Sequence, residues 1–364
     1  MKNKTAKTRS LRYFQRARRT DTSAQAGIGL VEIMVAMAIG VFMLGGVLSL
    51  VLWVSRTRVD LDKTSEQIEN GRYAIQLISN ELRLGGFYGM SQIGTTASSM
   101  PTPCPTTAGE LGFSYDSTTL TTTLPVAIQG IASLPQADTT CFSNYKSGSE
   151  AIVVRHVETE SVATASAGVP YAQMSACQED SMPMDFGVSG TATFSLRQKN
   201  CSLPAVLWPY SIRAFYLGAC DICSPNDNVP TLKMAELRVS GGGIQVVGQS
   251  VVEGIEDMHF QYGMDLDTDG SPDCYVPDPA VDAPPAASNC PAGGWSDIDA
   301  TNWSNVVSVR INLLARSTEA SNDWKDDRTY DLGRGTPVGP FNDKFRRQIY
   351  STVVTLPNIS GVRE

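Results

Sequence analysis

The stretch from Gly27 to Val54 reads GIGLVEIMVAMAIGVFMLGGVLSLVLWV, and Glu32 is its one charged residue. As a helix, the residues after Gly27 would extend about 40 Å, whereas about 20 apolar residues suffice to cross a bilayer. The stretch therefore predicts a membrane-spanning helix. A carboxylate at mid-bilayer costs on the order of 2.5 kcal/mol or more. We therefore expect Glu32 to have a partner or to lie near the interface.

The segment before this stretch predicts the topology. Residues 1–27 carry eight basic and one acidic side chain, so we expect them to stay in the cytoplasm. Their small residues, Ser23 to Gly27, precede the apolar run, whereas a secretory signal is cut after its apolar run. Residues 28–364 carry 21 basic and 36 acidic side chains, a net charge of -15. This acidity argues against general nucleic-acid binding, which needs clustered cations.

The helical pattern continues beyond the membrane stretch. Apolar residues repeat at a spacing of seven, which predicts a stripe that docks on a globular domain: Leu61, Ile68, Ile75 and Leu82, with Leu77 and Ile78 beside them. Polar residues fill the other faces: Asp62, Lys63, Glu66, Glu69, Arg72 and Glu81. Gly85 and Gly86 end the pattern. We predict a helix over residues 28–84, in which Gly40, Gly45 and Gly46 are soft points.

The rest of the chain, residues 85–364, has strand patterns instead. Residues 91–140 are rich in Thr, Ser and Pro and predict loops and short edge strands. Strands are predicted at Ala151–Val157, Thr191–Leu196, Ser211–Leu217, Leu232–Val239, Ile244–Val252, Met258–Tyr262, Val307–Leu313 and Gln348–Leu356. Alternation in several of them favours antiparallel strands with one buried face. The predicted fold is α+β: one long N-terminal helix packed on a globular domain rich in antiparallel sheet.

Eight cysteines all follow the predicted helix: Cys104, Cys141, Cys177, Cys201, Cys220, Cys223, Cys274 and Cys290. In an oxidising compartment this even number predicts four disulfides. The sequence leaves 105 connectivities open. Pairing between neighbours is favoured, above all Cys274 with Cys290, which would close a Pro-rich loop. Cys220 and Cys223 also fit a redox or half-zinc motif, but no second CxxC or adjacent His supports it, so a structural disulfide is the favoured interpretation.

The acidic run from Asp265 to Asp273 resembles the start of a calcium loop. Asp265, Asp267 and Asp269 stand at positions one, three and five, Gly270 at six and Asp273 at nine. Position twelve is Val276 instead of Glu, which rules out a complete EF-hand loop. Two interpretations remain. One is a calcium site that borrows Asp278 or Asp282, and the other is a solvated acidic turn; calcium is the one cofactor that the sequence suggests.

The chain contains two histidines, His156 and His259, both in strand patterns. We expect each to be a surface or hydrogen-bonded residue rather than a catalytic base. No HExxH, GxSxG, Walker A or GxGxxG motif is present. The sequence therefore predicts that the protein is not an enzyme.

The residues around Gly27 resemble the processing site of type IV prepilins, in which a Glu stands at the fifth position after Gly. The resemblance implies cleavage between Gly27 and Ile28 by a prepilin peptidase, followed by N-methylation of Ile28. It also implies that Glu32 neutralises the N-terminal ammonium of a neighbouring subunit. Ile28 departs from the usual Phe, and the apolar run lacks the Pro of major pilins. The missing Pro suggests a straighter helix or a minor subunit.

Three later segments resemble the PilW family of minor pilins: Ser250–Gly263, Val309–Ser317 and Phe345–Val354. The resemblance implies a leader over 1–27, a helix over 28–84 whose residues 28–54 span the inner membrane, and a periplasmic domain over 85–364. It further implies priming of pilus assembly near the tip of the fimbrium. The implied partners are the major pilin, other minor pilins, a tip adhesin and the inner-membrane assembly platform, with twitching motility and cell adhesion as the processes served.

Two other functions share parts of this pattern. A minor pseudopilin of type II secretion would have the same leader and helix. A signal-anchored periplasmic enzyme or a calcium-dependent binding module would use the apolar stretch only as an anchor.

Overall fold

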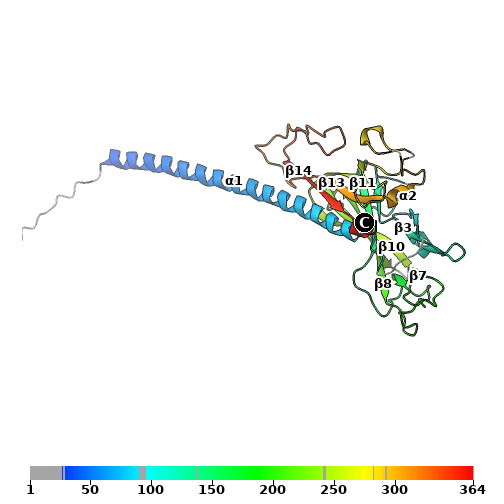
Figure 1. The fold of residues 1–364 in the computed structure, drawn as a ribbon. Helices are drawn as coiled ribbons and strands as arrows, with labels where there is room; N and C mark the ends of the chain where they lie inside the picture. Colours follow the sequence, from blue (N-terminus) through cyan, green and yellow to red (C-terminus); the bar gives the residue numbers. More distant parts are fainter. Residues whose placement is uncertain are drawn as a thin grey trace, which may run out of the picture. The chain divides into compact units, whose positions relative to one another are not determined.

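The structure is a computed structural model that describes residues 27, 29–89, 96–136, 138–240, 243–281, 283–291 and 293–363. The chain divides into two compact units, Met1–Arg58 and Val59–Glu364. Helix α1 (Leu30–Leu84) begins in the first unit and ends in the second (Figure 1). By length and composition, α1 is capable of crossing a membrane. Leader residues 1–26 and Ile28 lie outside the described residues.

Helix α1 runs for 55 residues without interruption. The predicted soft points, Gly40, Gly45 and Gly46, are helical, and a Cβ at any of them would meet nothing within 4 Å. The helix ends where the sequence predicts, because Gly86 adopts a φ of +79°. The Asn358 side-chain amide donates to the carbonyl oxygens of Arg83, Leu84 and Gly85 at 3.1–3.3 Å, so it satisfies acceptors that a helix end leaves free.

Fourteen strands and a few short helical turns follow α1 in the described residues. The strands are β1 (Thr96–Ser99), β2 (Ser114–Asp116), β3 (Thr121–Pro125), β4 (Ile128–Ile131), β5 (Ala151–Val157), β6 (Pro170–Met174), β7 (Met184–Val188), β8 (Leu207–Gly218), β9 (Thr231–Ser240), β10 (Gly243–Glu253), β11 (Ile255–Met264), β12 (Cys274–Val276), β13 (Val306–Arg316) and β14 (Arg347–Thr355). The helical turns are η1 (Ala108–Leu111), η2 (Ala286–Ser288), α2 (Asp299–Ser304) and α3 (Pro357–Ser360).

The strands form three sheets, and all their pairings are antiparallel except β1 with β3. The largest follows the order β10-β9-β8-β5-β4, with β6 and β7 joined to it through β8. A second sheet has the order β12-β11-β13-β14, and its strands β11, β13 and β14 lie side by side in Figure 1. The small sheet β1-β3-β2 completes the set. The predicted α+β class, with one long helix and antiparallel sheet, is confirmed.

The largest sheet is buried on both faces. Alternate residues of β5 face opposite sides, since Ile152 and Val154 join one core cluster while Ala151 and Val153 join another. The first cluster also contains α1 residues and the inward side chains of β11 and β13. The second cluster contains the residues of β6 and β7. Docking of α1 therefore occurs on one face of the largest sheet, next to the second sheet.

The predicted strand Thr191–Leu196 is wrong. Its amides bond locally or to a side chain: Thr191 and Ala192 donate to the Val188 carbonyl, and Leu196 donates to Gln173 Oε1. A strand would need those groups for a ladder. The sequence analysis also missed β6, β7 and β12.

Candidate functional site

Glu32 lies in the first turn of α1, exposed. A carboxylate is favoured there by the positive end of the helix dipole. The backbone turn that starts the helix is built on Gly29, whose carbonyl accepts the amide protons of Glu32 and Ile33 at 2.9 and 3.3 Å. The predicted processing pair is described only in part: Gly27 is exposed, and Ile28 lies outside the described residues. Glu32 is thus available to a group from another molecule.

The first part of α1 presents an apolar surface on all sides. Its large apolar residues are at least 45 % exposed, from Leu30, Val31, Ile33, Met34, Val35, Met37 and Ile39 through Val41, Phe42, Met43, Leu44, Val47 and Leu48 to Leu50, Val51, Leu52 and Trp53. Such an extended apolar surface is rare on a soluble monomer. A helix that is hydrophobic all round needs lipid or other helices about it.

The second part of α1 docks through a face that overlaps the predicted stripe in its last turns. Leu61 is 63 % exposed, and Ile68 and Ile75 are only half-buried. The buried face combines apolar, small and polar residues: Ala74, Ile78 and Leu82 with Gly71, Gln67, Ser79 and Glu81. The prediction that this segment docks one side on the domain is right: Ile78 and Leu82 are fully buried, and Ile75 and Leu77 pack against the same core cluster. Leu61 is exposed, contrary to the prediction, and the buried Gly71 and Gln67 were not predicted.

Gly71 shows why small residues matter in this docking face. The Tyr350 ring of β14 lies over Gly71, and a Cβ there would come within 2.3 Å of a ring carbon. One turn earlier, Gln67 Nε2 donates to the Ala315 carbonyl of β13 at 2.9 Å. The helix therefore approaches the second sheet closely enough to bond its backbone.

Glu81 forms a buried ionic cluster between α1 and the largest sheet. One carboxylate oxygen lies 2.6 Å from His156 Nε2 of β5, and the other accepts a bond of 2.8 Å from Arg213 of β8. His156 is fully buried, and its Nδ1 lies 2.9 Å from the Val157 carbonyl. Burial by itself would raise the pKa of Glu81, but His156 and Arg213 together lower it. The prediction that Glu81 lies on a solvent-exposed face of the helix is wrong, because Glu81 is buried.

A long connection between β13 and β14, residues 317–346, also contacts α1. Lys63 Nζ donates to the Ala320 carbonyl at 3.0 Å and pairs with Glu319 at 3.1 Å. Ser321 Oγ lies 3.2 Å from Asp60 of the helix. These contacts are polar and partly exposed, so each contributes little by itself.

Arg347, at the start of β14, anchors that connection. Its guanidinium is almost fully buried and donates to Glu256 of β11, to Asp326 and to Asp343. Burial alone would lower the pKa of Arg347, but the three carboxylates raise it. Tyr330 packs into the same connection and donates to Asp326 at 2.8 Å. The connection is therefore held to the sheet by a buried charge network.

The eight cysteines form four disulfides, Cys104–Cys141, Cys177–Cys201, Cys220–Cys223 and Cys274–Cys290. Every pair joins sequence neighbours, the pairing that the sequence analysis favoured. No cysteine remains free within the described ranges.

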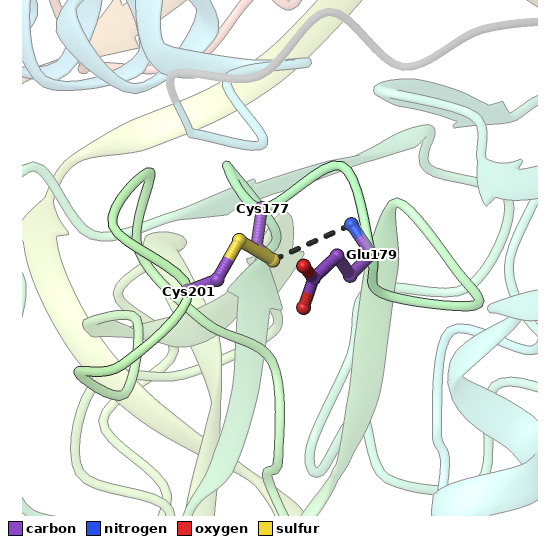
Figure 2. Close-up of side chains that lie close together, drawn as sticks. All are labelled: Cys177, Glu179 and Cys201. Atoms are coloured by element: carbon purple, nitrogen blue, oxygen red, sulfur yellow. Dashed lines mark hydrogen bonds between the residues drawn. A yellow bond between two sulfur atoms is a disulfide. The ribbon is translucent and has the colours of Figure 1, made fainter.

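Cys177, Glu179 and Cys201 come together in a way that resembles metal ligands (Figure 2). The two sulfurs are bonded to each other, and Cys177 Sγ accepts the Glu179 amide proton at 3.4 Å. Thiolates are what metals bind, and a disulfide supplies none. The group is therefore a cross-linked turn.

The acidic run brings Asp265, Asp267 and Asp269 together, as the sequence predicts for a turn. Asp265 is fully buried, and its carboxylate accepts the amide protons of Thr268, Asp269 and Gly270. Arg363 donates to the same carboxylate at 3.0 Å. Burial would raise the pKa of Asp265, but Arg363 and the amides lower it. Arg363 thus supplies a positive charge to Asp265.

The other predicted ligands accept backbone amide protons. Asp273 accepts the Leu266 amide proton, and Asp278 accepts that of Ala280. Asp282 lies outside the described residues. The calcium site therefore stays a prediction.

His259 was expected to be a surface or satisfied residue, and it belongs to a second ionic cluster. His259 Nδ1 lies 2.8 Å from Glu150, which also pairs with Arg334. Arg334 in turn binds Asp257 at 2.7 Å and the Met258 carbonyl at 2.6 Å. Sequence reasoning missed this cluster and that of Arg347, because their members are far apart in the chain and no spacing links them.

Comparison with known proteins gives one family. Residues 214–358 match the family PilW, described as Type IV Pilus-assembly protein W. The matched region extends from within β8 to the start of α3 and includes the Arg347 network and the β13–β14 connection. Neither the curated proteins nor the solved structures gave a match. The family match confirms the resemblance over residues 214–358.

Proposed function

We propose, from the PilW match over residues 214–358, that this chain is a minor pilin that helps prime type IV pilus assembly. The observation that carries the proposal is Glu32, the one charged residue between Gly27 and Val54, which lies in the first turn of α1 where the large apolar side chains from Leu30 to Trp53 are exposed. In this proposal residues 1–27 are a cytoplasmic leader, residues 28–84 the assembly helix and residues 85–364 the periplasmic domain.

The physical role of Glu32 follows from its surroundings. An isolated carboxylate is costly inside a bilayer, and so is an isolated ammonium. If cleavage after Gly27 creates an ammonium at Ile28, then Glu32 of one subunit and the ammonium of another neutralise each other as helices pack. The pair removes two uncompensated charges at once, which favours the assembled helices over separate ones.

The globular domain acts as an interaction platform in this proposal. Its partners are the major pilin, other minor pilins, a tip adhesin and the inner-membrane assembly platform, and its place in the filament is near the tip. The mature protein is N-methylated, resides in the inner membrane and then enters the filament on the cell surface. Twitching motility and cell adhesion would depend on it.

The first experiment is intact-mass measurement and N-terminal sequencing of the protein from membranes, with and without the prepilin peptidase. The proposal expects N-methyl-Ile28 at the N-terminus in the presence of the peptidase and an uncut leader in its absence. A leader that stays uncut in both strains would contradict it and favour a signal-anchored enzyme or binding module.

A second experiment separates the pilus from the related secretion machinery. Deletion of the gene should abolish surface pili and leave secretion of exoproteins unchanged. Loss of exoprotein secretion with normal pili would instead identify a minor pseudopilin of type II secretion.

A further inference from the structure

The Cys220–Cys223 disulfide has an unusual neighbour. Lys233 of β9 directs its ammonium at Cys223 Sγ, at an Nζ–Sγ distance of 3.6 Å. Lys233 is only 5 % exposed, and no described carboxylate lies within ion-pair distance of it. Burying an ammonium against neutral partners is costly. The described residues thus hold a buried cation whose one side-chain partner is a disulfide sulfur.

The neighbouring strand leaves room for the Lys233 side chain to extend toward Cys223. Its aliphatic stem lies across Gly218 at the end of β8, where a Cβ would come within 2.2 Å of the Lys233 Cε. The absence of a side chain at Gly218 gives the stem its path to the loop that follows β8. In the part of the chain described, no lysine or arginine donates a hydrogen bond to a sulfur of the other three disulfides, whose sulfurs accept backbone amide protons where they accept any.

The loop keeps its shape by bonds other than the disulfide. The Asp227 carboxylate accepts the amide protons of Asp221, Ile222 and Val229 at 2.8–3.1 Å. These amides, that of Ile222 first, hold the pKa of Asp227 below its ordinary value. Asp227 also donates its amide proton to the Ile222 carbonyl. Opening the disulfide would therefore leave the loop in place.

Access to the two sulfurs differs. Cys223 is partly exposed, whereas Cys220 is 4 % exposed. Ile222 between them is 59 % exposed and offers an apolar contact to an incoming chain. A thiol from solution therefore reaches Cys223 first.

We propose that Cys220–Cys223 is an exchangeable disulfide that reacts with the dithiol of a partner protein through Cys223, and that Lys233 stabilises the Cys223 thiolate. A partner thiolate attacks Cys223 Sγ, the Cys220–Cys223 bond breaks, and its electron pair leaves on Cys220, which takes up a proton. The second partner thiolate then attacks the partner sulfur of the mixed disulfide and releases Cys223 as a thiolate beside Lys233. The partner dithiol is oxidised to a disulfide, and the loop cysteines are reduced.

Some charged groups around the loop would destabilise the Cys223 thiolate, and Lys233 would stabilise it. Burial, Asp221, Glu66 and Asp227 raise the pKa of Glu253, so several carboxylates lie near one another at this end of the sheet. These carboxylates disfavour the negative charge of a Cys223 thiolate. Arg316 donates to the Asn228 carbonyl, but Lys233 is the cation that contacts the sulfur. An ammonium beside a cysteine favours its thiolate, which makes the sulfur a better leaving group and increases the fraction of it present as thiolate.

The test equilibrates the full chain, in detergent, in glutathione buffers of graded ratio. Acid quenching, alkylation and peptide mass spectrometry then give the reduced fraction of each pair. We expect Cys220–Cys223 to be reduced at a less reducing ratio than the other three disulfides. Lys233→Met should shift its equilibrium about fivefold or more toward the disulfide. Lys233→Arg should restore the original equilibrium, and Lys146→Met, which removes a lysine that contacts a carbonyl, should leave it unchanged.

A second readout measures Cys223 directly. In Cys220→Ser, the rate of alkylation of Cys223 by iodoacetamide is followed against pH, with and without Lys233→Met. The midpoint of this profile should rise when Lys233 is replaced. The proposal is overturned if Cys220–Cys223 is as hard to reduce as the other pairs, or if Lys233→Met moves neither the equilibrium nor the alkylation profile.

Discussion

The two parts of helix α1 share one secondary structure and have opposite side-chain chemistry. In residues 30–58 the apolar side chains are exposed and the carboxylate Glu32 has no partner among the described residues. In residues 59–84 the buried face includes Gln67 and Glu81, and Glu81 is paired on both oxygens. A charged side chain of a helix can therefore form an ion pair within its own chain or remain available to another molecule. Glu81 pairs within the chain, and we propose that Glu32 pairs with another molecule.

The largest effect is expected at Glu81. Glu81→Ala leaves the buried His156 without its carboxylate and removes one of the three carboxylates of Arg213, which keeps Glu158 and Glu236. Removing one partner of a buried ionic pair costs about 3–5 kcal/mol. Chemical denaturation of the full chain in detergent would measure the lost free energy of unfolding. Glu69→Ala, at an exposed helical position, is the control and should change stability by no more than about 0.5 kcal/mol. Equal stability of the two variants would mean that the cluster contributes nothing to docking.

Glu32→Ala should leave the domain as stable as the wild type and impair assembly. Without the carboxylate, the proposed subunit ammonium stays unpaired among packed helices at a cost of about 2.5 kcal/mol, which corresponds to roughly a seventyfold loss in the assembly equilibrium. Counting surface pili by electron microscopy measures this, and membrane fractionation confirms that insertion is intact. Normal piliation would remove the ion pair from the mechanism.

The glycines of α1 sharpen the comparison. Gly71→Ala places a Cβ against the Tyr350 ring, so we expect a loss of about 1–3 kcal/mol from overpacking. Gly45→Ala, in the first unit, meets nothing and should leave unfolding of the domain unchanged. Denaturation midpoints of the two variants provide the measurement. A stable Gly71→Ala protein would mean that Tyr350 moves aside at little cost.

The smallest effect is expected from pH. His156 and Arg213 lower the pKa of Glu81 in the folded state, against burial, from its ordinary value of 4.5. A depressed carboxyl pKa stabilises the fold above the unfolded value and loses this contribution as pH falls through the folded value. Between about pH 5 and about pH 3, wild-type stability should fall by about 1 kcal/mol more than that of Glu81→Gln. Parallel pH profiles would contradict the assignment.

The long helix and most central strands were predictable because their patterns are local. Residues 151–157 were predicted with the observed bounds, and β11 and β13 were recognised by alternation within each strand. Neighbour pairing of the cysteines was also accessible, since each pair closes one short segment.

What could not be predicted depends on contacts across the chain. Glu81 reads as a solvent-facing residue until His156 and Arg213 are brought to it, from 75 and 132 residues away. The docking face was predicted only in part for a similar reason, because Gly71 lies against the Tyr350 ring and has no side chain that a hydrophobic pattern would detect. The Asp265 turn matched a calcium loop in spacing, yet Arg363, 98 residues away, supplies its countercharge.

The cap at the end of helix α1 can form only late in the synthesis of the chain. Asn358 bonds the carbonyls that end the helix, and it is made 275 residues after Arg83. During synthesis the helix is therefore complete long before its end is closed. A subunit whose synthesis stops early keeps free acceptors at this end, so the cap distinguishes a finished subunit from an interrupted one.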